Sequence, residues 1–299
     1  LAEWRSSRPG RAVGFAPLLA VDALEEAPST PLPAGPTRPL DGVRVLDLTR
    51  VVAGPVCGRF LAAYGADVLR VDGPAAEDSP ALVADTTVGK RSAILDLRAP
   101  GDREVFERLV AEADVVLQAY RPEALDRLGY GPPALAELRP GLVVASLSAY
   151  GGVGPWRTRR GFDSLVQFAT GIADEGRAAT GTDAPVSLPV QALDHATGYL
   201  LAAGVATALH RRTTGGGAWH VRASLARTAH WLDALGRTDA SVSAPPAPTE
   251  ESMVELSGPL GRTLHLRPPG ALDGYSPEWS SPPRPLGYDA PAWPSRSAR

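Results

Sequence analysis

The sequence predicts an α/β protein built on a Rossmann-like parallel sheet with helices on both faces, plus a long helix and a Pro-rich extended tail. Short apolar strands alternate with helical segments over residues 43–146. The first strand, loop, helix and second strand fit within about thirty residues, as in a parallel βαβ unit. The 299 residues are enough for one large domain or two ordinary ones. This alternation is typical of a doubly wound sheet.

The first half of the chain supplies most of the predicted sheet. We expect strands at residues 43–48, 66–71, 92–97, 115–118 and 142–146, and helices at residues 56–64, 100–113 and 122–128. Asp102 and Glu104 stand near the start of the second of these helices, where they complement its positive end. Ahead of the sheet we expect one short helix at residues 20–27 and a Pro-rich linker at residues 28–39.

The second half of the chain has a different pattern. We expect helices at residues 162–172, 192–212 and 224–235, and a strand at residues 219–223. The helix at residues 192–212 is alanine-rich and mostly apolar, so it should be buried on several sides. From residue 244 onward, prolines and isolated aromatic residues replace the regular pattern, and only one hairpin is expected, at residues 253–266. The remainder is predicted to be an extended tail that wraps a surface.

Composition excludes several classes of protein. The net charge is −3, whereas binding to nucleic acid or to an anionic membrane requires clustered basic charge. No apolar run is long enough to cross a membrane. The single cysteine, Cys57, excludes an internal disulfide framework and fits a reducing cytoplasm. Because the chain begins with Leu1 and has no signal pattern, we expect a fragment or a processed product.

Two short glycine-containing motifs each allow two interpretations. GKRS at residues 89–92 is close to a phosphate-binding P-loop, but Ala84 replaces the required glycine and Arg91 follows Lys90. Lys90 is therefore either a phosphate contact or a solvated charge. GGVGP at residues 151–155 follows a strand. It is either a backbone that approaches a ligand with its N–H groups or an ordinary flexible turn.

Most familiar catalytic and metal-binding patterns are missing. The five histidines and Cys57 lack metal-ligand spacing, so no metal is predicted, and no GxSxG nucleophile motif occurs. Asp194 is the notable carboxylate, since it lies just inside the start of the long apolar helix. On the residues alone, it either complements the helix dipole or acts as a reachable nucleophile.

Five sequence blocks, in order, resemble those of the family III CoA-transferases, the CaiB/BaiF group. They are PLDGVRVLDLTRVVAGPVCGRFLAAYGADVLRVDGP from Pro39, KRSAILDLR from Lys90, ADVVLQAYRPEALDRLGYG from Ala113, SLSAYGGVGPWRTRRGFDSLVQ from Ser146 and LPVQALDHATGYLLAAGVATAL from Leu188. Their preserved order makes the resemblance more specific than any single block.

The resemblance implies transfer of coenzyme A between an acyl-CoA and a carboxylic acid, with CoA thioesters as substrates and no tightly bound cofactor. Asp194 matches the position of the family's catalytic aspartate. Its carboxylate would attack the acyl-CoA thioester, and the released thiolate would then form an aspartyl-CoA thioester. An ionised carboxylate needs no general base. We expect the helix start to lower the pKa of Asp194 and keep it ionised.

The resemblance also implies which residues contact CoA. Arginine guanidinium groups suit the phosphates of CoA because they can bind them bidentately. The matching positions are Val52, Ala53, Leu95, Arg98, Ala119, Tyr120, Arg121, Arg127 and Arg160. We expect Arg98, Arg127 and Arg160 to line one CoA groove. Ala119 stands where the family commonly has asparagine, so one polar contact would be missing.

Two departures from the family pattern qualify the expected activity. Racemases of the superfamily have histidine where this chain has Phe162, so α-proton exchange is not expected. The family's sizeable small domain is replaced by Pro-rich sequence after Trp231. We therefore expect an N-terminal extension or linker at residues 1–38, the family α/β domain at residues 39–240, and a tail at residues 241–299. That tail would be a remnant of the small domain or a segment that wraps a dimer.

These features define the expected partners and one alternative function. The apolar helix at residues 192–212 and the tail with Trp279 and Trp293 would both expose apolar surface to water in a single chain. This favours a homodimer in which a second chain buries that surface. The alternative is a catalytically impaired CoA-binding subunit or scaffold that pairs with a full-length homologue. Neither nucleic acid nor a membrane is an expected partner.

Overall fold

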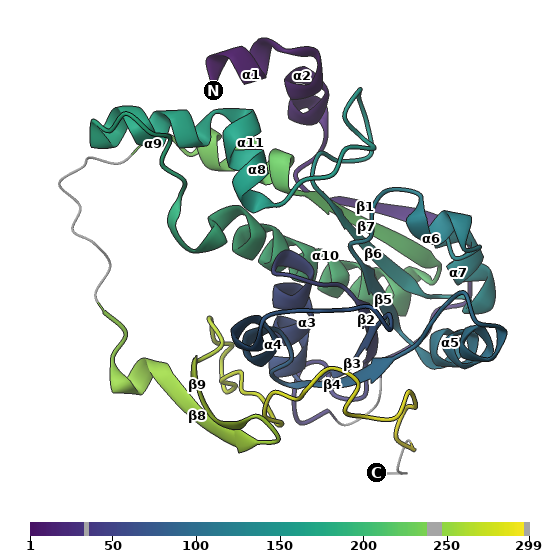
Figure 1. The fold of residues 1–299 in the computed structure, drawn as a ribbon. Coiled ribbons are helices and arrows are strands. Elements are labelled where there is room, and N and C mark those ends of the chain that lie inside the picture. Colours follow the sequence, from purple (N-terminus) through teal and green to yellow (C-terminus); the bar gives the residue numbers. More distant parts are fainter. Residues whose placement is uncertain (33–35, 238–246, 296–299) are drawn as a thin grey trace.

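A seven-stranded sheet organises the computed structural model, which describes residues 1–32, 36–237 and 247–295 (Figure 1). The strand order is β1-β7-β6-β5-β2-β3-β4. Strands β2 to β7 run parallel, and β1 joins the edge antiparallel to β7. The predicted α/β class is confirmed. The strands are β1 (Ala20–Glu25), β2 (Arg44–Leu48), β3 (Asp67–Asp72), β4 (Lys90–Ile94), β5 (Val115–Gln118), β6 (Val143–Ser148) and β7 (Ala218–Ser224).

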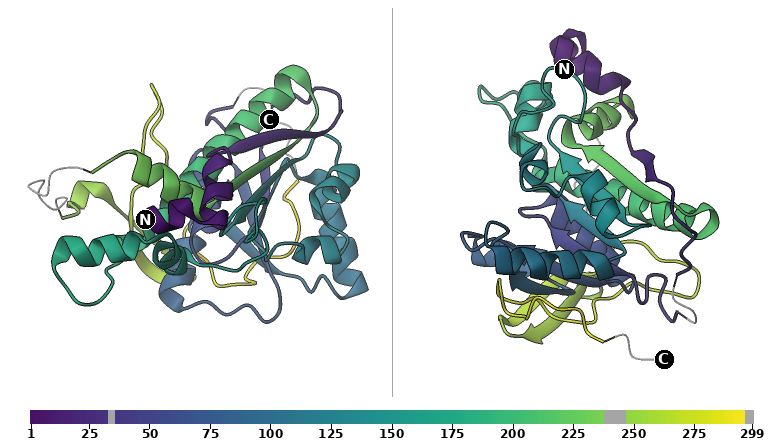
Figure 2. Two further views of the ribbon diagram at one scale, coloured as in Figure 1. Left: turned by 90° about the horizontal axis from the view of Figure 1, so that it is seen from above. Right: turned by 90° about the vertical axis from the view of Figure 1, so that its right-hand side faces the viewer.

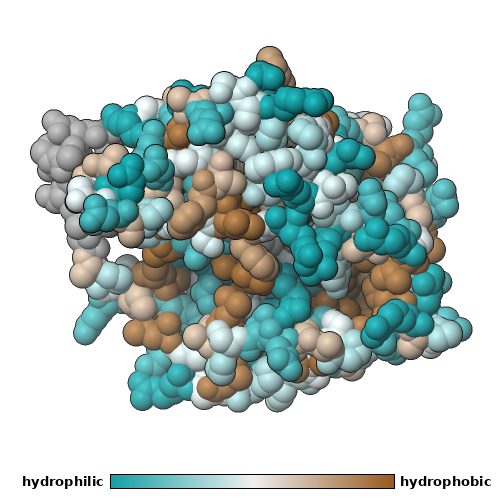
Figure 3. Space-filling model, turned by 45° about the horizontal axis from the view of Figure 1, so that its top comes forward, coloured by the Kyte–Doolittle hydropathy of each residue, from teal (hydrophilic) through white to brown (hydrophobic). Residues whose placement is uncertain are grey.

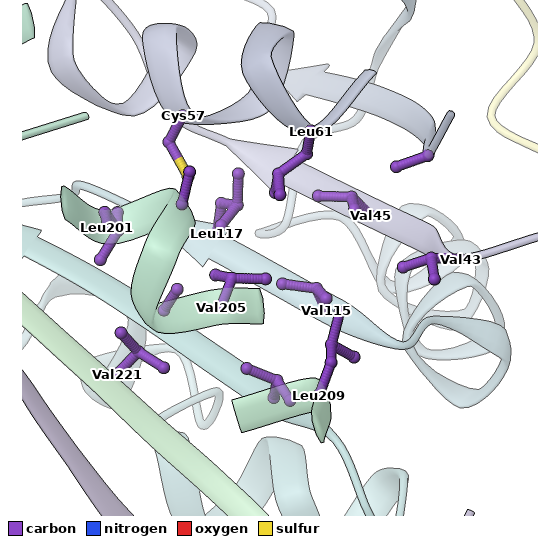
Figure 4. Close-up of a cluster of buried hydrophobic side chains, with 14 of the residues drawn as sticks. Val43, Val45, Cys57, Leu61, Val115, Leu117, Leu201, Val205, Leu209 and Val221 are labelled. Carbon is purple, nitrogen blue, oxygen red and sulfur yellow. The ribbon is translucent and has the colours of Figure 1, made fainter. Parts of the chain in front are cut away.

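Helices cover both faces of the sheet, which explains why all five residues of β2 are buried and why the first three residues of β5 are apolar. On one face lie α3 (Ala53–Ala63) and α10 (Ala192–Gly215), and on the other α5 (Pro100–Glu112) and α7 (Pro132–Leu138). Figure 4 shows Cys57 and Leu61 of α3 together with Val205 of α10 around Val115 and Leu117 of β5. Short helices α4 (Pro80–Thr86) and α6 (Ala124–Arg127) follow β3 and β5.

The N-terminal residues are more structured than the sequence suggests. Residues 20–25 form strand β1, so the helix expected at residues 20–27 is wrong. Alanine, leucine and glutamate favour helices, but pairing with the open edge of β7 overrides that local preference. Before β1 come α1 (Ala2–Ser6) and α2 (Arg8–Phe15). The indole Nε1 of buried Trp4 donates to His230 Nε2 at 2.8 Å, which ties these helices to the body of the protein.

A third group of helices packs beside the sheet around a separate apolar cluster. It comprises α8 (Asp163–Thr170), α9 (Ile172–Thr180) and α11 (Leu225–Ala234), together with α1 and α2. The single-turn helix η1 (Pro189–Gln191) leads directly into α10. Helices α4, α7 and α9 were not predicted, because their short amphipathic segments give only one or two turns of periodicity.

The long helix α10 and the C-terminal tail are both covered by this same chain. The apolar side chains of α10 pack on α3 and the sheet, while its exposed positions carry alanine, threonine, histidine and arginine. The expected hairpin is present as β8 (Met253–Gly258) and β9 (Gly261–Leu266), preceded by η2 (Glu250–Ser252). Neither element therefore requires a second chain to cover it. The boundary expected between residues 240 and 241 lies outside the described residues.

After the hairpin, the tail runs along the end of the molecule opposite the N-terminal helices (Figure 2). Its aromatic side chains bond to main-chain carbonyl groups of α3 and α5. The Tyr275 hydroxyl donates to Ala63 O at 2.7 Å, and the Trp279 indole donates to Arg59 O at 2.9 Å. Trp293 donates to Leu109 O at 2.9 Å. None of the helices in residues 1–32, 36–237 and 247–295 has the length and hydrophobicity of a membrane span.

Candidate active site

The predicted CoA contacts lie on loops at the carboxyl edge of the sheet. Val52 and Ala53 follow β2, while Ala119 and Tyr120 follow β5. Strands β2 and β5 are neighbours, yet the chain leaves β2 toward β3 on the other side. This makes the gap between β2 and β5 a topological switch point, where open α/β sheets bind ligands. The sheet thus places these four residues on two loops at the same edge, on either side of the switch point.

The predicted arginine contacts have separate local surroundings. Arg98 is 77% exposed at its side chain and bonds to Asp96 at 2.9 Å. Arg127 lies 3.6 Å from Glu123. Arg121 and Arg160 are exposed, whereas the predicted contact Leu95 is buried after β4. The shared CoA groove for these arginines stays a prediction.

Asp194 lies in the first turn of α10, with only 6% of its surface exposed. The residue before the helix, Gln191, makes no side-chain capping bond. Asp163 of α8 takes that role, because its Oδ2 accepts a hydrogen bond from the Asp194 main-chain N–H at 2.9 Å. The helix start is therefore capped from another helix.

Asp163 is fully buried and belongs to a small network that positions the segment before α10. The Gln167 amide donates to Asp163 Oδ1, and its own carbonyl accepts from Leu188 N–H at 2.7 Å. Asp163 was not among the predicted site residues. Its signal was its place at the start of a predicted helix, directly after Phe162.

The surroundings of Asp194 raise its pKa to about 7, first through burial and then through the nearby charge of Asp163. Among the described residues, no side chain donates a hydrogen bond to the Asp194 carboxylate. The expectation that the helix start lowers its pKa is wrong, because burial and a like charge outweigh the helix dipole here. A carboxyl group with a strongly shifted pKa is a candidate functional residue.

The start of α3 is pressed against α10 one turn beyond Asp194. Gly198 lies at this point of the helix, and a Cβ atom there would stand 2.5 Å from Ala53 O and 2.8 Å from Val56 Cβ. Only glycine allows this close approach. Ala53 and Leu193 also share one apolar cluster. The structure thus joins the predicted CoA loop to the helix that carries the candidate nucleophile.

Residues with a strained backbone lie in the loops after β2 and β5 and in the segment just before α10. Four non-glycine residues in the described part of the chain have positive φ: Val51 at 72°, Glu123 at 65°, Val190 at 55° and Gln191 at 54°. Val51 precedes the predicted CoA loop, Glu123 follows Arg121, and the other two precede α10. Positive φ is costly for a β-branched valine and is characteristic of functional sites.

Lys90 is neither a phosphate contact nor a solvated charge, so both sequence interpretations are wrong. Its fully buried Nζ donates to Asp47 Oδ2 at 2.7 Å and to Pro55 O at 3.0 Å. A Cβ atom at Gly58 would stand 2.5 Å from Asp47 Oδ2, so α3 passes directly over this ion pair. Burial lowers the pKa of Lys90, while Asp47 opposes that shift. The pair anchors the start of α3 to the sheet.

Comparison with known proteins adds independent evidence. A family model described as CoA-transferase family III matches residues 40–254. The probable fatty acyl-CoA transferase Rv3272 of Mycobacterium tuberculosis is 37% identical over 196 residues, which cover 61% of this chain and 49% of that protein. The succinyl-CoA–D-citramalate CoA-transferase of Chloroflexus aurantiacus is 35% identical over 199 residues, or 60% of this chain and 48% of that protein. The chain thus spans about half the length of these curated relatives.

Solved structures agree with this similarity. A crystal structure of Rv3272 has a TM-score of 0.59 at 38% identity, covering 67% of this chain and 57% of that chain. A CAIB/BAIF family protein from Brucella suis has a TM-score of 0.60 at 29% identity, covering 75% of this chain and 65% of that chain. No group of three or more metal-ligating side chains occurs within the described residues.

Proposed function

The chain belongs to CoA-transferase family III, and on that basis we propose that it transfers coenzyme A between an acyl-CoA and a carboxylic acid through Asp194. The observation that supports this role most strongly is the buried Asp194 carboxyl group, whose pKa is raised to about 7 in a strained helix start. A carboxylate that only complements the helix dipole would instead have a lowered pKa. A role for Asp194 that is limited to stabilising the helix dipole therefore does not fit its surroundings.

The proposed reaction proceeds through four substitutions at carbonyl carbons. The Asp194 carboxylate attacks the donor thioester, giving an acyl-aspartyl anhydride and CoA thiolate. The thiolate attacks the aspartyl carbonyl, giving an aspartyl-CoA thioester and the free donor acid as its carboxylate. The acceptor carboxylate attacks that thioester, releasing CoA thiolate and forming a second anhydride. Thiolate attack on the acceptor acyl carbon then gives the new acyl-CoA and restores Asp194.

The residues around Asp194 support these steps by position and charge. With a pKa of about 7, the carboxyl group is about half ionised at neutral pH, and only the ionised form attacks. Asp163 holds the first turn of α10 through the Asp194 N–H. The N–H groups at the start of α10 are suited to stabilise the oxyanions that form at the aspartyl carbonyl.

We assign the CoA nucleotide to the carboxyl edge of the sheet. Val52, Ala53, Ala119 and Tyr120 would contact it at the switch point between β2 and β5, as parallel sheets generally allow. The exposed arginines would meet its phosphates, and Arg98 would first have to release Asp96. The acyl donor and acceptor are carboxylic acids of a class that the chain itself does not define.

We also propose that a second chain covers α8, as a homodimer or with a homologue, in the cytoplasm. Phe162, Leu165 and Phe168 follow one side of α8 and are exposed, Phe168 by 53%. Val190 beside Asp194 is exposed as well. Hydrophobic side chains are also visible across the middle of the molecular face in Figure 3. A group of exposed apolar side chains beside an active site is typical of an interface.

A transfer assay with Asp194→Asn tests the proposed function. We expect the wild-type chain to exchange CoA between members of a panel of acyl-CoAs and acids. The Asp194→Asn variant should fold and bind CoA but show no measurable transfer. Asp174→Asn is the matched control, because Asp174 is an exposed carboxylate of α9 paired with Arg177, and it should keep full transfer. Wild-type CoA binding without transfer would instead favour the CoA-binding subunit or scaffold.

A further inference from the structure

A large cavity opens at the carboxyl ends of β5, β6 and β7, away from Asp194. Its volume is about 630 Å³, within the range of small-molecule sites. Of the predicted catalytic and CoA-binding residues, only Tyr120 is among those that line it. The N-terminal segment that joins α2 to β1 forms one wall, through Phe15 and Pro17. The residues expected to form an extension or linker therefore build part of the cavity wall.

The cavity combines apolar walls with a hydrogen-bonded polar floor. Pro122, Pro132 and Val153 provide further apolar surface. On the floor, the Gln118 amide donates to Ser146 Oγ at 2.7 Å, and His220 Nε2 lies 2.9 Å from the same oxygen. Burial, followed by the charge of Arg222, lowers the pKa of His220 to about 4. The floor is therefore uncharged at neutral pH.

Unused hydrogen-bond donors lie at the rim. Arg157 and Gly152 line the cavity, and neither the Arg157 guanidinium nor the Gly152 N–H has a partner within residues 1–32, 36–237 and 247–295. The neighbouring Arg222 is paired with Asp22. Asp126 carries the one carboxylate among the lining residues. A free cation and a free main-chain N–H on the glycine-rich loop form a natural site for an anion.

The rim also exposes apolar side chains that a ligand would cover. Phe15 is 88% exposed and Val153 is 50% exposed, although both line the cavity. A bound molecule with an apolar body would remove these side chains from water, which is favourable. Free Arg157 beside this surface means that the same molecule should carry a negative group at one end.

We propose that this cavity is a second ligand site, which binds an amphipathic monocarboxylate with its carboxylate on Arg157 and Gly152 N–H and its apolar body against Phe15, Pro17 and Val153. The site is distinct from the Asp194 centre and does not depend on the proposed transfer reaction. The GGVGP run, for which the sequence left two interpretations, then has a ligand-binding role.

Calorimetry with naphthylacetate as the probe tests this site. We expect saturable binding to the purified chain and much weaker binding of naphthylethanol, its uncharged analogue. Arg157→Gln should weaken naphthylacetate binding by about tenfold or more, because it removes a charge-assisted hydrogen bond. Val153→Glu should weaken it further by placing a like charge at the rim. Arg108→Gln is the matched control, since Arg108 is exposed on α5 and lies outside the cavity lining, so it should bind as the wild type does.

Two further arms separate this site from the proposed transfer centre. Asp194→Asn should bind naphthylacetate with unchanged affinity, and Arg157→Gln should bind CoA as the wild type does, although Tyr120 lines the cavity and is also assigned to CoA. The proposal is overturned if naphthylacetate does not bind, if Arg157→Gln binds it as well as the wild type, or if Arg157→Gln also loses CoA binding. If Asp194→Asn abolishes transfer while naphthylacetate binding is lost only in Arg157→Gln and Val153→Glu, the two sites are independent.

Discussion

At the scale of single residues, burial of the Asp194 carboxyl group, the proposed nucleophile, costs stability at neutral pH. Its surroundings raise the pKa to about 7 because the side chain is buried beside Asp163. Between an ordinary carboxyl pKa near 4 and about 7, the folded chain keeps a proton that the unfolded chain releases. The free energy of unfolding should therefore fall as pH rises through this window.

Asp194→Asn should remove this pH dependence. Near pH 4 the variant and the wild type should unfold with similar free energies, whereas near pH 8 the variant should be more stable by up to about 4 kcal/mol. Urea unfolding at a series of pH values measures the difference. Asp174→Asn should unfold in parallel with the wild type. A constant difference between Asp194→Asn and wild type from acid to alkaline pH would contradict the raised pKa.

The buried ion pair of Lys90 and Asp47 makes a second prediction at the residue scale. Lys90→Met leaves the Asp47 carboxylate buried without its cation, which should destabilise the fold by about 3–5 kcal/mol. Adding Asp47→Asn should restore part of that loss, since the pair is then removed as a unit. Arg98→Met, which breaks an exposed pair, should have little effect. An equal loss for Lys90→Met and Arg98→Met would contradict the structural role of Lys90.

At the scale of elements, the contact between α3 and α10 fixes Asp194 relative to the predicted CoA loop. Sequence patterns predicted both helices from their apolar residues. They could not show that Gly198 faces the carbonyl of Ala53, because that contact joins segments far apart in the chain. The pKa of Asp194 was mispredicted for the same reason: burial by the fold raises it first and the Asp163 carboxylate of α8 second, and neither can be seen within its own helix.

Gly198→Ala tests that contact. The added methyl group meets the Ala53 main-chain oxygen and the Val56 side chain of α3, so we expect a loss of about 1–3 kcal/mol in unfolding free energy, although alanine favours helix by about 1 kcal/mol. Gly215→Ala, in the same helix with open space around the site, should cause no loss. Thermal and urea unfolding of both variants measures the difference. Equal stability of the two variants would show that the helices are not pressed together here.

At the scale of the whole molecule, the central strands of the sheet could be predicted well from the sequence. The edge strand β1 and the C-terminal tail could not. Central strands such as β5 are apolar on both faces, and the sequence pattern located them closely. Strand β1 was mistaken for a helix because only pairing with β7 makes it a strand. The tail was expected to need a partner, but its isolated aromatic residues bond to main-chain groups of α3 and α5. Such long-range pairings leave no local periodicity.

The tail should therefore stabilise its own chain. Trp279 donates to Arg59 O and packs so closely on Gly89 that a Cβ atom there would be 2.6 Å from its ring. Trp279→Ala should lower the unfolding free energy by about 1–3 kcal/mol and speed amide hydrogen exchange in α3. Leu264→Ala, at an exposed position of β9, is the control and should change neither quantity. Wild-type exchange rates in the Trp279→Ala variant would contradict this role of the tail.

The most direct test of the central claim is peptide mass spectrometry of the chain after incubation with an acyl-CoA. The proposed reaction predicts a CoA thioester on the peptide that contains Asp194, which hydroxylamine converts to a hydroxamate at that residue. The adduct should be absent from Asp194→Asn and present in Asp174→Asn. An adduct that persists in Asp194→Asn, or transfer by the wild type with no adduct on this peptide, would contradict Asp194 as the nucleophile.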